Sequence, residues 1–278
     1  PGFQKCKITQ YGYAIEYEYS DPKKLTETLE SKHIKKLIFA RQINGTTGYE
    51  EAAAQGFMAG INSACNVLGM NAIRISRNEG YIGVLIDDLI TKGVDEPYRM
   101  FTSRAEHRLL LRQDNAGLRM LKHAREIGIC SENELKDREK SLDMVNAEIR
   151  RLGSVFHKSV TLSQLLKNPD MSYDRLPGHN PRLPDEVKKH VEIQLKYEGY
   201  IRREQEQIKR QSHIENVQIP NWIDYTVIKT LRFESSQKLQ KIRPTTLGQA
   251  SRIPGVNPSD IAILDVLIRR GPPKKPVS

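Results

Sequence analysis

The clearest alternation of apolar and polar positions lies near the start of the chain. From Tyr11 to Tyr19, every second residue is tyrosine or isoleucine, so these side chains share one face of an extended segment. The pattern predicts a β-strand that Asp21-Pro22 ends, followed by a short helix over residues 23–31. Such an aromatic face can stack a base or a flavin ring, but packing within a core or on a sheet is commoner, and we expect that role.

A strand, a glycine-rich turn and a helix are predicted next. The apolar run at residues 36–40 indicates a buried strand. Gly45 and Gly48 allow the turn a positive φ, and Thr47 followed by Glu50 fits a capping box, which makes Thr47 the expected N-cap. Small residues then form one smooth helix face: Ala52, Gly56, Gly60 and Ala64.

This arrangement places free backbone N–H groups at a helix N-terminus beside the end of a strand, where nucleotide cofactors bind. The acidic residues Glu50 and Glu51 repel a phosphate, so a phosphate contact is expected from the turn, at residues 44–47. An ordinary strand–turn–helix of an α/β protein explains the glycines equally well.

The apolar run at residues 81–91 contains two adjacent carboxylates, Asp87 and Asp88. Adjacent side chains on a helix point about 100° apart, so the pair does not form a metal or acid–base site by itself. We expect a helix cap or the polar edge of a helix.

A second capping box, from Ser103 to Glu106, predicts a helix on which three arginines share a face. Residues 97–130 carry 7 Lys and Arg against 3 Asp and Glu, a net charge of +4. Guanidinium groups in such a row match phosphate oxygens, but they can equally pair with carboxylates inside the protein. The three arginines are Arg104, Arg108 and Arg112, and Arg99 precedes them.

The remaining chain is predicted to be mostly helical. Helices are expected up to about Ile127, over residues 133–152, over residues 185–211 as one long helix, and from Asn257-Pro258 to Gly271, with irregular chain over residues 154–184. We expect Trp222 to be buried in a small helical core. Residues 185–278 carry a net charge of +6, from 17 Lys and Arg against 11 Asp and Glu. The basic tail with Lys274 and Lys275 is expected to be disordered.

Composition points to a polyanionic partner. The 278 residues include 44 Lys and Arg against 34 Asp and Glu, a net charge of +10, which favours nucleic acid first and a membrane surface second. A basic protein without such a partner fits the same charge. The three cysteines have no disulfide or zinc spacing and suggest a reducing compartment. The sequence shows no apolar run of membrane-spanning length and no signal peptide.

Four long runs together resemble one family. They are residues 42–56 (QINGTTGYEEAAAQG), 96–106 (EPYRMFTSRAE), 191–201 (VEIQLKYEGYI) and 249–256 (QASRIPGV). In this order they resemble the C-terminal half of MnmG, also called GidA, the large subunit of the tRNA wobble-uridine modification enzyme. The family's first flavin fingerprint and its catalytic cysteine segment have no counterpart in the chain, so we expect a piece of a larger enzyme and assign no catalytic residue and no metal ligand.

The resemblance implies a fold and an activity. The implied fold is the α/β end piece of a flavin-binding domain followed by a mostly α-helical C-terminal region. The implied enzyme holds FAD, takes electrons from NADH and a one-carbon unit from a methylene-folate, and modifies the wobble uridine of tRNA together with the GTPase MnmE. It also implies a homodimer at full length, no membrane, and a cytoplasmic location in a bacterium or a mitochondrial one in a eukaryote.

The resemblance also implies domains and site residues. The expected domains are residues 1–75 (the end of the FAD domain), 76–130 (a basic connector with the arginine face), 131–210 (helical) and 211–278 (a C-terminal helical subdomain). The implied flavin contacts are Gln42, Asn44, Gly45, Thr46 and Thr47, and the implied tRNA contacts are Arg99, Arg104, Arg108 and Arg112.

Two residues depart from the family pattern: Arg41 replaces a glycine, and His107 replaces a tyrosine. If position 41 needs a positive φ or a close approach to the cofactor, arginine weakens flavin binding. A catalytically inactive module that binds tRNA or MnmE is the alternative function, and an all-helical nucleic-acid binder is a third, supported by charge alone.

Overall fold

The structure is a computed structural model that describes residues 2–215 and 217–271, with side chains outside residues 210–216. These residues are mostly helical, with one small antiparallel sheet in which Phe156 pairs with Thr161 and His157 with Val160. The strands are β1 (Phe156–His157) and β2 (Val160–Thr161). The α-helices are α1 (Tyr49–Leu68), α2 (Tyr81–Lys92), α3 (Ala116–Arg119), α4 (Leu121–Ile127), α5 (Glu132–Ser154), α6 (Leu162–Leu166), α7 (Asp185–Lys196), α8 (Glu198–Glu215), α9 (Phe233–Ile242), α10 (Leu247–Arg252) and α11 (Pro258–Arg270). Short 3₁₀ helices are η1 (Pro22–Lys24), η2 (Arg41–Asn44), η3 (Thr102–Arg104) and η4 (Tyr173–Arg175).

Helix α2 is the centre of the N-terminal part. Every residue from Gly83 to Thr91 is buried, because α1, η1, the 98–111 segment and α10 pack around it. Backbone approaches it closely at Gly83, where a Cβ would lie 2.3 Å from the Ser76 carbonyl oxygen. A helix that is apolar on all sides is stable only in such a surrounding.

The middle part is built on α5 and α7. The charged helix predicted over residues 133–152 is confirmed as α5, and a capping box of Ser131 and Glu134 marks its start. Val145 and Leu152 of α5 pack with Val187 and Val191 of α7, all nearly fully buried. This core is separate from that of α2; it includes Leu162 and Leu166 of α6, and the small sheet lies at its edge.

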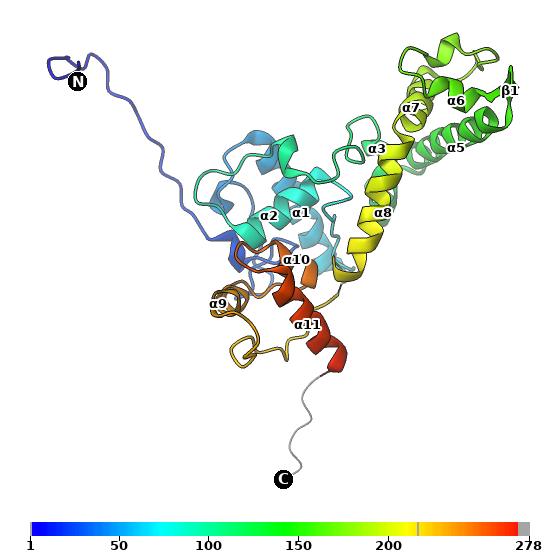
Figure 1. The fold of residues 1–278 in the computed structure, drawn as a ribbon. Helices are drawn as coiled ribbons and strands as arrows, with labels where there is room; N and C mark the ends of the chain where they lie inside the picture. Colours follow the sequence, from blue (N-terminus) through cyan, green and yellow to red (C-terminus); the bar gives the residue numbers. More distant parts are fainter. Residues whose placement is uncertain (1, 216, 272–278) are drawn as a thin grey trace.

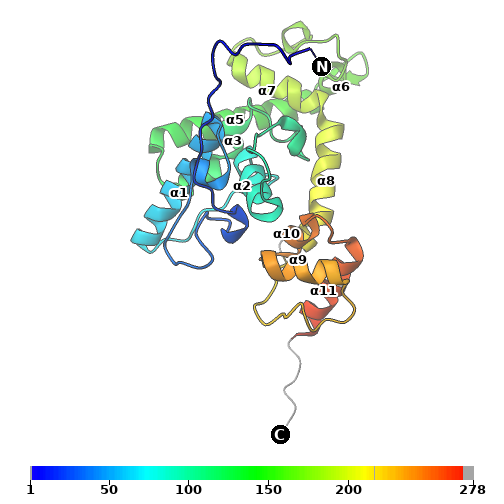
Figure 2. The ribbon, with the colours of Figure 1, turned by 90° about the vertical axis from the view of Figure 1, so that its left-hand side faces the viewer.

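The C-terminal part is a bundle of α9, α10 and α11. Leu239, Leu247 and Leu264 form its fully buried centre. As predicted, Pro258 occupies the first turn of α11, Asn257 is the N-cap, and Gly271 ends the helix with φ +78°. In Figures 1 and 2, α8 runs from the α5–α7 part to this bundle.

Several predicted elements are different in the structure. Residues 11–19 do not form a strand: their side chains are exposed, and Figure 1 shows this segment leaving the body of the molecule. A strand needs a partner for its backbone groups, and the described residues provide none. Residues 36–40 form only an isolated bridge, between Ile38 and Glu30, and Lys36 has φ +65°, which interrupts an extended run. Residues 23–31 form η1 and a bridge rather than a helix.

Three helix predictions also need correction. The N-cap of α1 is Gly48, so Thr47 does not cap it. The expected long helix over residues 185–211 is broken at Tyr197, whose ψ of 6° leaves the helical region, and α8 begins after it. Trp222 is 40% exposed, and Ile223 and Tyr225 fill the core in its place. The expected disorder of the tail with Lys274 and Lys275 lies outside the described residues.

Candidate functional site

The glycine turn is held to α1 by buried side-chain hydrogen bonds. Asn44 is fully buried, and its Nδ2 donates to the Phe39 carbonyl at 2.9 Å and to Gln55 Oε1 at 2.8 Å. The Gln55 amide donates to Thr46 Oγ1 at 2.6 Å, and that hydroxyl donates to the Arg41 carbonyl at 2.9 Å. The side chains of Asn44 and Thr46 therefore fix the turn, because most of their polar atoms are used within the protein.

The turn is also attached to the second motif, residues 96–106. Thr46 and Tyr98 form a parallel bridge, in which the Tyr98 N–H donates to the Gly45 carbonyl at 2.8 Å. The Met100 N–H donates to Glu51 Oε1 at 2.8 Å, and Arg99 lies 3.7 Å from the other oxygen of Glu51. Two motifs about 50 residues apart in the sequence thus form one local structure.

Some polar groups at the turn have no hydrogen-bond partner from a side chain of the described residues. No side chain caps α1, so the N–H groups of its first turn have no acceptor from a cap. Gln42 is half-buried and Thr47 is exposed. The buried Oδ1 of Asn44 has no hydrogen-bond partner. The uncapped helix N-terminus suits a ligand with acceptors or negative charge, whereas the Asn44 oxygen is buried inside the turn.

Local packing and backbone conformation also require glycine at positions 45 and 48. Gly45 has φ +77°, and a Cβ there would lie 2.4 Å from a methyl of Val94 and 3.3 Å from the Tyr19 ring. A Cβ on Gly48 would collide with the carboxylate of Glu51 and the guanidinium of Arg99. Arg41 adopts φ +75°, the left-handed conformation that glycine takes without strain. Position 41 therefore has the positive φ under which we expected arginine, in place of the family's glycine, to weaken flavin binding.

A buried charge network lies beside the turn, centred on Arg77. This guanidinium, 7% exposed, donates to Asp87 at 3.0 Å, to Asp88 at 2.8 Å and to Glu106 at 2.6 Å. Tyr98 joins it by donating its hydroxyl to Asp88 at 2.9 Å. The network connects the loop before α2, α2 itself and the second motif, so Asp87 and Asp88 are buried ion-pair partners rather than a helix cap.

Ionisation in this network follows from its geometry. Burial acts to raise the pKa of Asp88, but Lys92 and Arg77 outweigh it and hold that pKa below its usual value. The pKa of Glu106 is lowered in the same way by Arg77. Burial and the carboxylate of Asp88 raise the pKa of the Tyr98 hydroxyl, so Tyr98 acts as a hydrogen-bond donor at neutral pH.

The four arginines predicted to contact tRNA do not share a helix face. Only the short η3 forms over Thr102–Arg104, and residues 105–115 are turns in which Ala105, His107 and Leu111 are buried. The helix prediction fails because burying this irregular row of side chains is incompatible with a helix.

Three of these arginines have internal partners, since Arg99 pairs with Glu51, and two of the four, Arg99 and Arg108, present their guanidinium groups to solvent. Arg104 stacks on the Tyr98 ring at 4.4 Å and donates to the Arg99 carbonyl, while Arg112 pairs with Asp114 at 3.0 Å. The Arg99 side chain is 53% exposed. Arg108 is exposed, and among the described residues no hydrogen bond or ion pair to its side chain occurs.

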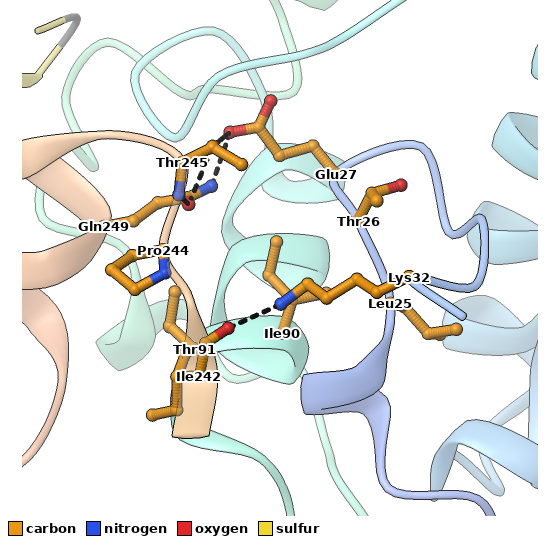
Figure 3. A pocket seen from close by; sticks show the side chains of 10 residues that line it. All are labelled: Leu25, Thr26, Glu27, Lys32, Ile90, Thr91, Ile242, Pro244, Thr245 and Gln249. Carbon is orange, nitrogen blue, oxygen red and sulfur yellow. Dashed lines mark hydrogen bonds between the residues drawn. The ribbon is translucent and has the colours of Figure 1, made fainter. Parts of the chain in front are cut away.

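The C-terminal bundle contacts the N-terminal part through polar groups. Figure 3 shows the Lys32 ammonium donating to the Ile242 carbonyl, at 2.7 Å, and Gln249 and Thr245 donating to Glu27. The void between them is only about 10 Å³, the space of one water molecule. A cleft of about 960 Å³ lies on the neighbouring side, lined among others by Arg74, Ser76, Glu79, His107, Thr246 and Asp265. The described residues contain no cluster of three His, Cys, Asp or Glu that could hold a metal ion.

Comparison with known proteins matches three consecutive regions. Residues 1–71 match the family model "Glucose inhibited division protein A", residues 115–205 match "tRNA modifying enzyme MnmG/GidA C-terminal helical domain", and residues 207–276 match "tRNA modifying enzyme MnmG/GidA C-terminal helical bundle". The chain belongs to the MnmG/GidA family and corresponds to its C-terminal half.

Individual MnmG relatives agree over almost the whole chain. The tRNA uridine 5-carboxymethylaminomethyl modification enzymes MnmG of Bacillus cereus and Caldicellulosiruptor saccharolyticus are each 47% identical, over 98% and 95% of this chain, but over only 47% and 46% of their own lengths. A crystal structure of Aquifex aeolicus GidA superposes with a TM-score of 0.82 at 44% identity, covering 89% of this chain and 42% of that one. The chain thus spans about half the length of the curated relatives it matches.

The Arg77 network lies where the three MnmG/GidA family models leave a gap, residues 72–114. Sequence reasoning missed Arg77 as its centre. The available signal was the pair of carboxylates inside an otherwise apolar helix, since buried carboxylates need a cationic partner. Nothing in the local pattern identified which arginine supplies it.

Proposed function

We propose that this chain contributes part of the flavin site and part of the tRNA-binding surface of an enzyme that modifies the wobble uridine of tRNA. The observation that carries the proposal is the uncapped start of α1, held rigidly by the Asn44–Gln55–Thr46 hydrogen bonds at the first shared motif. The family membership supports the proposed activity class, and the uncapped helix start supports a cofactor site at the turn.

In this proposal FAD lies against the turn. Gln42, the backbone of Gly45, Thr46 and Thr47, and the free N–H groups of α1 contact it, while the side chains of Asn44 and Thr46 hold the turn in place. FAD supplies the redox chemistry, NADH is the reductant, and a methylene-folate gives the one-carbon unit. The helix N-terminus favours negative charge, so α1 stabilises an electron-rich edge of the cofactor. Residues 1–75 are then the end piece of the flavin domain, completed by a polypeptide outside this chain.

The basic regions bind tRNA in this proposal. Arg99 and Arg108 are the two predicted tRNA contacts whose guanidinium groups are accessible, and residues 97–130 carry a net charge of +4. The connector 76–130 and the helical regions 131–210 and 211–278 also provide the surface for the GTPase MnmE and for a homodimer. Among the described residues, no helix is long and apolar enough to span a bilayer. A bacterial cytoplasm, or a mitochondrion in a eukaryote, is the compartment that we propose.

A non-catalytic module that binds tRNA or MnmE is the second candidate. Two observations favour it. Val94 and Tyr19 occupy the space beside Gly45 that a ligand could otherwise use, and Arg41 has a strained backbone. In that case the turn is only structural, and the helical regions carry the function.

The two candidates are distinguished by supplying the missing half. The chain is co-expressed with the part of the Bacillus cereus relative that it does not span, and bound flavin and wobble-uridine modification are measured by absorbance and nucleoside mass spectrometry. The enzyme proposal predicts flavin and modified uridine in the complex, and neither with the chain alone.

A matched glycine pair then tests the turn itself. Gly45→Ala is expected to abolish flavin binding, because residue 45 has φ +77° and faces Val94. Gly56→Ala is the control: its site lies within α1 in open space, and it is expected to bind flavin normally. A complex that folds and binds tRNA but never retains flavin supports the non-catalytic module.

A further inference from the structure

Two exposed aromatic rings flank the contact between the glycine turn and the second motif. Tyr49, the first residue of α1, is 89% exposed, and Phe101 is 60% exposed. Their backbones are held near each other because the Met100 N–H donates to Glu51 Oε1 at 2.8 Å. Neither ring belongs to a hydrophobic cluster of the described residues. The packing of this chain therefore does not explain why these two positions are aromatic.

A cation lies at the same place. Arg99 precedes Met100, and its guanidinium lies over Gly48, in the space that a Cβ on that glycine would occupy. Its ion pair with Glu51 is long, at 3.7 Å, and its side chain remains 53% exposed. This guanidinium thus lies beside the backbone of Gly48, the residue before Tyr49, and two positions before Phe101 in the sequence, and it is still open to a ligand. The rim is polar, since Thr47, Thr102 and Ser103 are exposed.

We propose that Tyr49, Arg99 and Phe101 form a stacking platform for an unpaired base of a single-stranded RNA segment, next to the flavin turn. Aromatic rings stack on the face of any base, and an arginine beside them neutralises the adjacent phosphate or stacks in turn. The platform rests on the proposed function. It adds a binding position for a base, whereas the basic regions alone provide only phosphate contacts.

Charge favours RNA over a protein partner at this surface. Residues 97–130 carry a net charge of +4 and the whole chain +10, which favours a polyanion as the ligand of the accessible Arg99. Glu50 is the exposed acidic group beside Tyr49, which directs the phosphates to the Arg99 side. A purely apolar protein contact does not need an accessible guanidinium such as that of Arg99.

The test compares two RNAs on the intact chain. One is a hairpin whose loop carries a fluorescent base analogue that is quenched by stacking, and the other is a blunt duplex of equal length. Phe101→Ala and Tyr49→Ala are each expected to weaken hairpin binding roughly 5- to 100-fold and to abolish quenching. Duplex binding is expected to stay within about twofold, because phosphate contacts persist. Phe101→Tyr and Tyr49→Phe should restore hairpin binding, and Phe233→Ala, a 78% exposed ring at the start of α9, is the remote control.

Three results overturn the platform. Unchanged hairpin affinity in both alanine variants, with a loss for Arg99→Ala, shows that this face binds only phosphate; the proposed function then survives without the platform. An equal loss for hairpin and duplex, or a lowered melting temperature, assigns the rings a structural role. If the unmodified chain binds neither RNA, the tRNA part of the proposed function fails together with the platform.

Discussion

The carboxylate of Asp87 accepts hydrogen bonds from two nitrogens of Arg252, Nε at 2.7 Å and Nη2 at 2.8 Å, although the residues are 165 positions apart. Asp87 lies on α2 and Arg252 ends α10, so this bidentate pair attaches the C-terminal bundle to the N-terminal part. Asp87 also accepts from Arg77, which in turn holds Asp88 and Glu106. The two arginines thus share one carboxylate at the junction.

Removing Arg252 is expected to loosen this junction. Arg252→Ala should lower the free energy of unfolding by about 1–3 kcal/mol, since it leaves a largely buried carboxylate with fewer partners. Denaturant melts measure the loss, and the double variant with Asp87→Asn should lose less than the sum of the single variants. Arg74→Ala is the control, because its pair with Glu27 is exposed and should contribute under about 1 kcal/mol. Additive losses would show that the pair does not couple the two parts.

Arg41→Gly is expected to stabilise the chain and to improve flavin binding. Arginine at φ +75° costs about 1 kcal/mol relative to glycine, and Arg41 lies at the start of the glycine turn, where we propose that the cofactor binds. Flavin fluorescence titration of the restored two-part protein measures the affinity, and a melt measures stability. Lys36→Gly is a matched control, because Lys36 has φ +65° outside the turn: it should raise stability without changing flavin affinity. An unchanged or weaker affinity for Arg41→Gly would contradict crowding of the cofactor.

The sequence predicted elements well where local signals agree. The charged helix over residues 133–152, the capped start of α11 and the glycine stops at Gly128 and Gly271 were predicted from short patterns, and the structure has them. Local chemistry alone fixes these points, because a cap satisfies its own helix end.

The sequence-based predictions fail where contacts between segments far apart in the sequence determine the structure. The alternation of residues 11–19 predicts a strand, but a strand exists only with a partner, which the described residues lack. The arginine helix was predicted from a capping box at Ser103, yet Ala105, His107 and Leu111 are buried against α2 and override it. The joining of the glycine turn to Tyr98 and the Arg77 network are long-range contacts, so no local period could reveal them.

Acid is expected to destabilise the C-terminal bundle through Asp260. Burial acts to raise its pKa, but Arg232, the Asn257 N–H and Ser235 lower it to about 2, from an ordinary 3.8. A depressed folded-state pKa contributes stability above the unfolded value, here about 2 kcal/mol, that is lost as pH falls from about 4 through 2. Melts at pH 7 and pH 2 measure this loss, and Asp260→Asn should remove most of the difference between the two pH values. Asp265→Asn is the control: Asp265 pairs with Arg269 in a more exposed place, so this variant should keep the difference in stability between the two pH values.

Arg108 is expected to bind tRNA through phosphate without supporting the fold. Its side chain is exposed and makes no hydrogen bond or ion pair with the described residues, so Arg108→Ala should leave the melting temperature unchanged. Affinity for all tRNAs should fall alike, and the slope of log affinity against log salt should become shallower by roughly one. Arg112→Ala is the matched variant, because Arg112 is paired with Asp114: it should change the salt slope little and lower stability by under about 1 kcal/mol. A filter-binding salt series and a melting curve on both variants separate the roles. Unchanged tRNA affinity in Arg108→Ala would remove this arginine from the tRNA surface and leave Arg99 as the accessible predicted contact.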